Sequence, residues 1–190
     1  IIDEVVCGFG RTGKMFGAEH FGVRGDIVSY AKGLTSGYVP MGAVAVSAKV
    51  NEVFLAGPLL HLNTYAGHPV AAAAALATLD VMKDEDLVAH AADMEEVLRD
   101  ALEGMRPGVR RIQDVSVIGL LSSVVSDISD MDDPDATVRR LRKEMYDEGL
   151  LARVARDGTN MSVHFYPALT VGPSDIERGV LALETALRRL

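Results

Sequence analysis

The stretch IIDEVVCGFGRTGK, Ile1 to Lys14, decides how the start of this chain folds. Its glycines at positions 8, 10 and 13 satisfy the G-x-G-x-x-G pattern of dinucleotide-binding proteins. That pattern needs a helix beginning at the glycines, because the free N–H groups of the helix N-terminus bind the pyrophosphate. After Gly13 come two more glycines, at 17 and 22, and no apolar stripe of helical period. The sequence therefore predicts a glycine-rich loop here.

An acidic residue lies in the apolar run before these glycines. Residues 1–6 are apolar and rich in β-branched side chains, which predicts a buried strand. Asp3 and Val5 are two residues apart, so they would face the same side of that strand. A carboxylate in such a place is costly unless it meets a cation or a hydrogen-bond donor. The residues alone leave two interpretations open: Asp3 binds a ligand, or it pairs with an arginine such as Arg11.

The remaining chain alternates predicted strands and helices, which indicates an α/β fold. The closing helix opens with the capping-box spacing Ser174 to Glu177. We expect strands at 26–30, 42–47, 150–154 and 161–165 and two strands within 110–125, and helices at 48–56, 69–83, 84–104, 134–148 and 174–190.

Composition bounds the class of protein. A hydrophobic content of 48% predicts a well-packed globular chain, and a net charge of -8 argues against nucleic acid as a partner. No apolar run is long enough to span a bilayer, so we expect no membrane association. The single cysteine, Cys7, favours a reducing, cytoplasmic setting. The five histidines show no zinc-binding spacing, so we expect no metal; the first residue is not Met, which suggests a fragment.

One of the five lysines has an unusual setting. Lys32 directly follows an apolar strand and is itself followed by Gly33, whereas the other four lie in a loop or on predicted helices. Because lysine is seldom buried without a partner, this position suggests an amine kept away from water and able to form a Schiff base. The alternative is a strand-end lysine whose amine simply reaches solvent.

Four separated motifs carry a family resemblance. They are Asp3-Glu-Val5, Gly8-Phe-Gly-Arg-Thr-Gly13, Ala31-Lys-Gly-Leu-Thr-Ser-Gly37 and Thr64-Tyr-Ala-Gly-His-Pro69. In this order they resemble the class III pyridoxal-phosphate-dependent aminotransferases, and the 29-residue spacing from Asp3 to Lys32 is similar to that family's. The resemblance covers the whole chain but only the C-terminal half or so of a family member. It implies fold type I, with residues 1–83 as the C-terminal part of the large cofactor-binding domain and 84–190 as the small C-terminal α/β domain.

The resemblance also implies roles for four residues toward pyridoxal 5'-phosphate. Asp3 would pair with the pyridine nitrogen of the cofactor, and Val5 would pack against its ring. Lys32 would form the Schiff base and then carry a proton between the reacting carbon atoms. Thr64 would bind the phosphate, in this family from the neighbouring subunit, so the resemblance implies a homodimer.

The connector from Ala31 to Ala43 looks most like the branch that uses ω-amines or ω-amino acids with pyruvate. The resemblance therefore implies amino-group transfer from such a donor to a keto acid. His164 lies where the acetylornithine and 4-aminobutyrate branches place an arginine, which puts a glutamate donor pair in doubt. Arg153 could bind a carboxylate instead, or be a surface charge. Two alternatives stay open: an inactive remnant of the fold, and an aminomutase of the same family.

Overall fold

The structure is a computed structural model that describes residues 1–55, 57, 61 and 63–190. It divides into two compact units, 1–89 and 90–190. The sequence placed the boundary slightly earlier, at 83/84. Within the described residues, no helix combines the length and apolar character needed to cross a bilayer.

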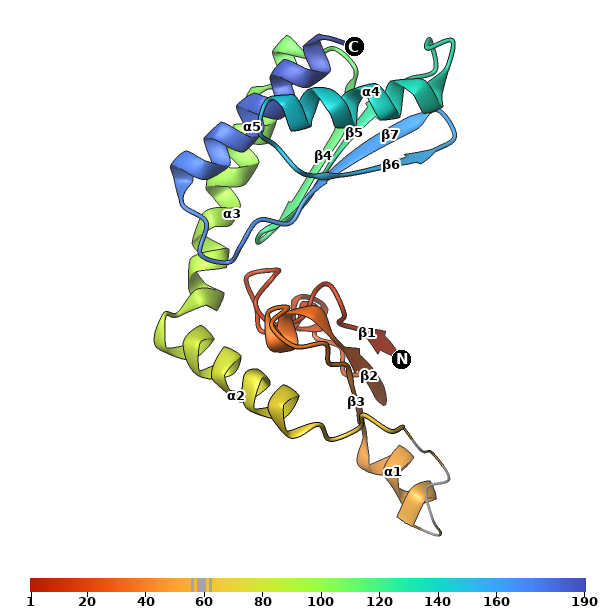
Figure 1. The fold of residues 1–190 in the computed structure, drawn as a ribbon, viewed down its shortest axis with the longest axis vertical. Coiled ribbons are helices and arrows are strands. Elements are labelled where there is room, and N and C mark those ends of the chain that lie inside the picture. The colour runs from red at the N-terminus through yellow and green to blue at the C-terminus, as the bar shows by residue number, and fades with distance from the viewer. Residues whose placement is uncertain (56, 58–60, 62) are drawn as a thin grey trace. The chain divides into compact units, whose positions relative to one another are not determined.

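The first unit is built on a three-stranded sheet of order β1-β2-β3. Strand β1 (Ile2–Asp3) pairs in parallel with β2 (Ile27–Tyr30), and β2 pairs antiparallel with β3 (Ala43–Val46) (Figure 1). In the parallel pair, Asp3 is the register partner of Ser29. The carboxyl ends of β1 and β2 therefore lie at the same edge of this sheet.

Within its described residues, the first unit also has two α-helices and two short 3-10 helices. The 3-10 helix η1 (Gly17–Phe21) follows the glycine loop, and η2 (Lys32–Thr35) follows β2. Helix α1 spans Ala48–Leu55, and helix α2 (Pro69–Asp84) packs against η2 with Ala71 and Ala75 buried. Proline opens α2 at its first turn, as predicted, because a missing N–H costs nothing there.

Three aromatic rings hold the glycine loop against the sheet. The centroid of the Phe9 ring lies 5.7 Å from that of Phe16 and 5.8 Å from that of Tyr30, and the last two are 5.3 Å apart. Rings at such separations and tilted angles pack favourably beyond the area they bury. Phe9 is buried, so this loop carries part of the unit's core although it has no regular structure.

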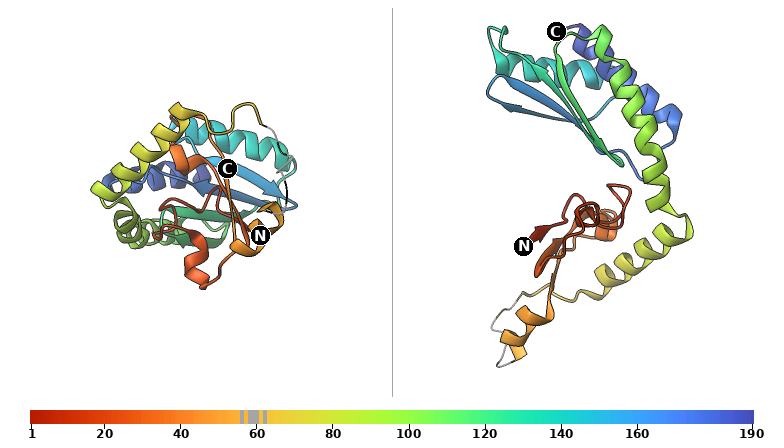
Figure 2. Two further views of the ribbon diagram at one scale, coloured as in Figure 1. Left: turned by 90° about the horizontal axis from the view of Figure 1, so that it is seen from below. Right: turned by 180° about the vertical axis from the view of Figure 1, so that it is seen from behind.

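The second unit is a four-stranded antiparallel sheet of order β4-β5-β7-β6 covered by three helices (Figures 1 and 2). Helix α3 begins just before the unit boundary, and a short 3-10 helix, η3 (Arg106–Gly108), leads to β4. The strands are β4 (Ile112–Ile118), β5 (Leu121–Asp127), β6 (Arg153–Asp157) and β7 (Asn160–Phe165), and the helices are α3 (Leu87–Gly104), α4 (Pro134–Asp147) and α5 (Pro173–Arg188).

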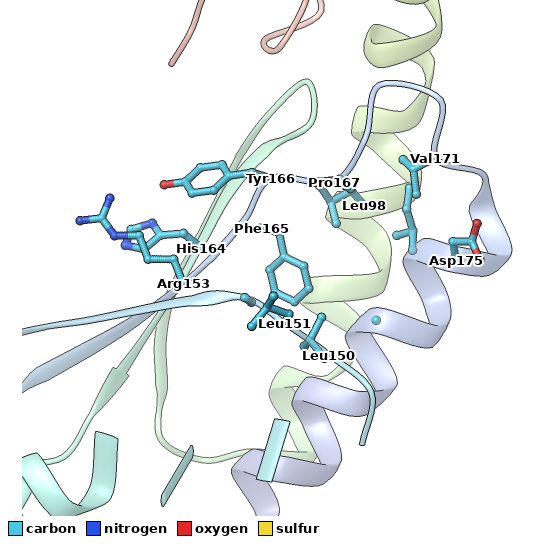
Figure 3. Close-up of a pocket in the computed structure, with 13 residues that line it drawn as sticks. Leu98, Leu150, Leu151, Arg153, His164, Phe165, Tyr166, Pro167, Val171 and Asp175 are labelled. Carbon is cyan, nitrogen blue, oxygen red and sulfur yellow. The ribbon is translucent and has the colours of Figure 1, made fainter. Parts of the chain in front are cut away.

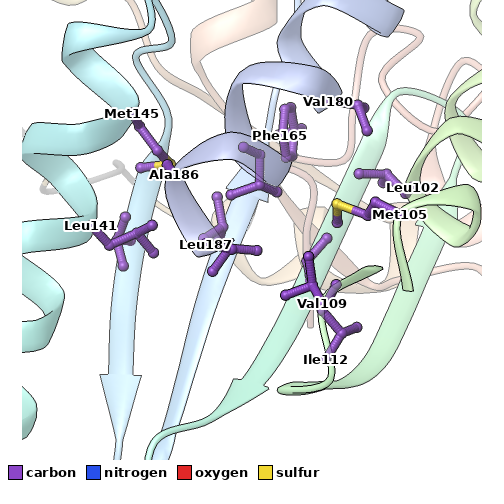
Figure 4. Close-up of a cluster of buried hydrophobic side chains, with 14 of the residues drawn as sticks. Leu102, Met105, Val109, Ile112, Leu141, Met145, Phe165, Val180, Ala186 and Leu187 are labelled. Carbon is purple, nitrogen blue, oxygen red and sulfur yellow. The ribbon is translucent and has the colours of Figure 1, made fainter. Parts of the chain in front are cut away.

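The core of this unit lies between one face of the sheet and the helices (Figure 4). Along β5, buried residues alternate with partly exposed ones, as a strand with one covered face requires. Val124 from β5, Leu98 from α3, Leu141 from α4 and Leu183 from α5 are all at most 1% exposed. Burial of such side chains contributes about 1.5–3 kcal/mol each, which makes this cluster the main source of the unit's stability.

Several element boundaries differ from those expected, among them the start of α3, which begins at Leu87 and not at residue 84. The first strand ends at Asp3 and not at residue 6, because the chain turns after Glu4. Strand β6 begins at Arg153, later than expected. Helix α5 has Gly172 as its N-cap with no side-chain cap, so Ser174 lies inside the helix and forms no capping box.

Candidate active site

Asp3 and Lys32 lie at one edge of the first unit's sheet. Asp3 is the last residue of β1, and Lys32 opens η2 two residues after β2 ends. Because β1 and β2 are parallel, both residues follow strand ends at the edge where ligands bind in open α/β sheets. The carboxylate and the amine that the sequence singled out therefore lie at the carboxyl ends of neighbouring strands.

The Asp3 carboxylate is oriented through one of its oxygens. The backbone N–H of Val5 donates to Oδ1 at 2.9 Å, and the Ser29 hydroxyl donates to the same atom at 3.1 Å. Within the part of the chain that the structure describes, Oδ2 accepts no hydrogen bond. Asp3 is exposed, so this second oxygen is available to a donor on a bound molecule.

Lys32 lies in a strained turn. Its φ is +44°, in the left-handed region. This conformation is unfavourable for a residue with a Cβ atom, and residues that adopt it are frequent at functional sites. The next residue, Gly33, lies so close to Phe9 that a Cβ added there would be 2.9 Å from the Phe9 Cβ. Lys32 itself is exposed, so the expectation of an amine kept from water is wrong within this chain. The apolar run before Lys32 and the glycine after it indicated the end of a strand. They carried no information about which residues pack on the Lys32 side chain.

Val5 and Thr64, the other two residues expected at the site, both lie in turns but differ in exposure. Val5 is half-buried in the turn that follows β1, so the strand alternation invoked for it does not apply. Its backbone still contacts Asp3 directly. Thr64 lies exposed in a turn before α2, next to Tyr65, whose N–H donates to Asn63 Oδ1 at 3.1 Å. His68 Nδ1 accepts a hydrogen bond from Ala71 N at the start of α2, which is a structural role.

Glu4 is a site feature that sequence reasoning missed. Its side chain is buried, and its two carboxylate oxygens accept N–H bonds from Gly17 at 2.9 Å and Ala18 at 2.8 Å. A carboxylate next to Asp3 in an apolar stretch was the available signal, because a second acid there also needs donors.

A cavity of about 250 Å³ lies in the second unit, next to Arg153, His164 and Tyr166 (Figure 3). Arg153 on β6 is the register partner of His164 on β7, and their head groups lie beside each other. The His164 ring stacks on the Tyr166 ring with centroids 6.0 Å apart, and Ser162 Oγ lies 3.0 Å from His164 Nε2. Among the described residues, Arg153 forms no ion pair, so its guanidinium is open to an anion.

Burial, and then the positive charge of Arg153, lower the pKa of His164 below its ordinary value. The imidazole is therefore neutral at pH 7, and one ring nitrogen can accept a hydrogen bond. With a neutral His164, the positive charge at this end of β6 and β7 comes from Arg153.

The residues at the sheet edge fit the cofactor that the resemblance implies. Asp3 offers an acceptor oxygen held by two donors, which suits a protonated ring nitrogen. Lys32 offers an exposed primary amine at the same edge, which suits an aldehyde. The two side chains therefore have the chemistry that a pyridine nitrogen and an aldehyde carbon require.

Comparison with known proteins shows the family of this chain. The family model described as "Aminotransferase class-III" matches residues 1–187. An omega-aminotransferase of Caulobacter vibrioides is 38% identical over 192 residues, a match that covers 98% of this chain and 42% of the relative. An omega-amino acid–pyruvate aminotransferase of Pseudomonas putida is 35% identical, with 100% of this chain and 42% of the relative covered.

A solved structure agrees in fold as well. An S-selective transaminase from Arthrobacter sp., with alanine bound, superposes with a TM-score of 0.88 at 33% identity, covering 99% of this chain and 43% of that chain. This chain therefore spans about two fifths of the length of the curated relatives it matches.

Proposed function

This chain belongs to the class III aminotransferase family and has the fold type I architecture of its transaminases, and from that premise we propose a function for the intact protein. It transfers an amino group from an ω-amine or ω-amino acid to a keto acid such as pyruvate, with pyridoxal 5'-phosphate attached to Lys32. The observation that carries this proposal is the placement of Asp3 and Lys32 at the carboxyl ends of two parallel strands.

Each site residue has a task that its surroundings support. When bound, pyridoxal phosphate supplies an electron sink next to the reacting carbon. Asp3 would hold the proton on the ring nitrogen, through the oxygen that no local donor occupies. Lys32 Nζ would attach the cofactor and then carry a proton between carbon atoms, which needs the neutral amine. Val5 would contact the ring from the turn beside Asp3.

The acceptor class rests on the second unit and on the relatives. The relative from Pseudomonas putida uses an omega-amino acid and pyruvate by its name. Arg153, which pairs with no carboxylate among the described residues, is the candidate to bind the carboxylate of the acceptor or of an ω-amino acid. His164 beside it is neutral at pH 7, which favours binding of one carboxylate over two.

We also propose the assembly that the resemblance implies. Residues 1–83 would belong to a larger cofactor-binding domain and 84–190 to a small domain. Two copies would form a homodimer in which the exposed Thr64 binds the cofactor phosphate of the neighbouring subunit.

The experiment is uptake of pyridoxal phosphate by the intact protein. We expect a visible absorbance band from the attached cofactor, fixed to the Lys32 peptide after borohydride reduction and lost in Lys32→Ala. Lys83→Ala, which removes a lysine from helix α2, is the matched control and should keep the band. A band that survives in Lys32→Ala would refute the assignment. Turnover of an ω-amine that needs no added pyruvate would instead indicate an aminomutase.

A further inference from the structure

Glu4 is a buried carboxylate next to Asp3, with a surface only 2% exposed. The N–H groups of Gly17 and Ala18, at the start of η1, each donate to one of its oxygens, at 2.9 and 2.8 Å. A buried carboxylate is stable only where donors or cations compensate its lost hydration. Both oxygens are used in this way, so Glu4 is held firmly by η1.

The main chain of Glu4 is held as well. Its N–H donates to Ser29 O at 2.9 Å, and its carbonyl accepts from Gly8 N at 2.9 Å. Glu4 thus joins β2, the glycine loop and η1. The two donors that orient Asp3 belong to residues this arrangement fixes: Val5 is the next residue, and Ser29 receives the Glu4 N–H.

The same arrangement extends toward Lys32. Gly8, whose N–H donates to the Glu4 carbonyl, is followed by Phe9, which is buried and has a φ of +59°. Phe9 lies against Gly33, the residue after Lys32, with no room between them for a methyl group. Displacement of Glu4 would therefore move Phe9, which packs against the Lys32 turn, together with the two groups that donate hydrogen bonds to Asp3.

We propose that Glu4 is a positioning residue that holds the Asp3 carboxylate and the Lys32 turn in place for the cofactor. This inference rests on the proposed function. The competing explanation is that Glu4 only stabilises η1. Glu19 allows the two to be separated, because its Oε1 accepts from Phe16 N at 2.8 Å at the same end of η1, while its side chain is exposed. Among the described residues, the Glu19 side chain forms no hydrogen bond or ion pair with β1 or with Asp3, so Glu19→Gln is the matched control.

The test is a titration of the apo form of the intact protein with pyridoxal phosphate. Glutamine keeps the shape of Glu4 but directs an NH₂ group at a backbone N–H, so one hydrogen bond is lost and two donors face each other. We expect Glu4→Gln to bind the cofactor about tenfold more weakly or worse, and Glu19→Gln to stay within about twofold. Glu4→Gln should also change the pH dependence of the bound cofactor's spectrum, because Asp3 sets the ring protonation; a purely structural role would not.

Two results would overturn the proposal: unchanged cofactor affinity in folded Glu4→Gln, or an equal loss in both variants. If Glu4→Gln does not fold, hydrogen exchange of the wild-type apo protein decides instead. The Val5 amide, which donates to Asp3, should then open together with the Gly17 and Ala18 amides, and opening of Gly17 and Ala18 while Val5 stays protected would refute the proposal. Failure of the wild type to take up cofactor would refute the proposed function, while the exchange result would still report on Glu4 alone.

Discussion

Replacing Gly33 by alanine tests whether close packing supports the turn at Lys32. A Cβ at position 33 would lie 2.9 Å from the Phe9 Cβ and 3.4 Å from its Cδ2. Side chains with a Cβ do not approach one another this closely, so one segment must move. Phe9 cannot easily yield, because it is buried between Phe16 and Tyr30 at centroid distances of 5.7 and 5.8 Å. The strain therefore falls on the backbone that carries Lys32.

The expected cost follows from other overpacked sites. An added methyl in a well-packed place destabilises by about 1–3 kcal/mol, and we expect Gly33→Ala to lose that much free energy of unfolding. Urea denaturation of the intact protein measures the change, and hydrogen exchange of the β2 amides assigns it to the first unit.

Gly42→Ala is the control in the same connector. A Cβ there would meet only Tyr30 O, at an ordinary 3.5 Å, so its effect should stay within about 0.5 kcal/mol. If Gly33→Ala costs no more than Gly42→Ala, the contact between Phe9 and the Lys32 turn does not constrain the site, and the reasoning fails.

Three further predictions concern the second unit. Ser122 is 3% exposed and, among the described residues, its Oγ has no hydrogen-bond partner; Ser122→Ala should leave the free energy of unfolding unchanged or raise it by up to about 1 kcal/mol, and a clear loss in urea would contradict this. Asp133 Oδ1 caps α4 by accepting from Ala136 N at 2.9 Å, so Asp133→Ala should cost about 1 kcal/mol of that free energy while Asp133→Asn keeps most of it. Burial and the Arg153 charge lower the pKa of His164, so the unfolded chain takes up the proton more readily; stability should fall as pH drops below about 6.5, and His164→Gln should flatten that part of the curve. A wild type that gains stability on acidification relative to His164→Gln would exclude this explanation.

Patterns along single elements were readable from the sequence. The helix that begins at Pro69 and the strand that precedes Lys32 each depend on near neighbours, and the structure has both. The glycines of the first loop were also correctly separated from a nucleotide-binding turn, because no helix begins at Gly13. The placement of Asp3 and Lys32 at one end of the sheet depends on the parallel pairing of β1 with β2, which no local pattern specifies. Only the family resemblance implied that the two residues act together.

Features set by distant partners were not readable. The chain leaves β1 after Asp3 because Glu4 is tied to η1, thirteen and fourteen residues further on, so the expected strand through Val5 was wrong. The capping box failed because α5 begins one residue before Ser174. The exposure of Lys32 depends on which segments pack over it, and a strand end followed by glycine carries no information about that.

The one-sided hydrogen bonding of Asp3 has a consequence for a familiar substitution. In Asp3→Asn the amide oxygen must take the place of Oδ1, because Val5 N–H and the Ser29 hydroxyl both need an acceptor there. The NH₂ group is then turned outward, where the carboxylate had offered a lone pair. The substitution would thus put a hydrogen-bond donor where the carboxylate was an acceptor, and it would also remove a negative charge. The variant would therefore favour a pyridine whose ring nitrogen is unprotonated.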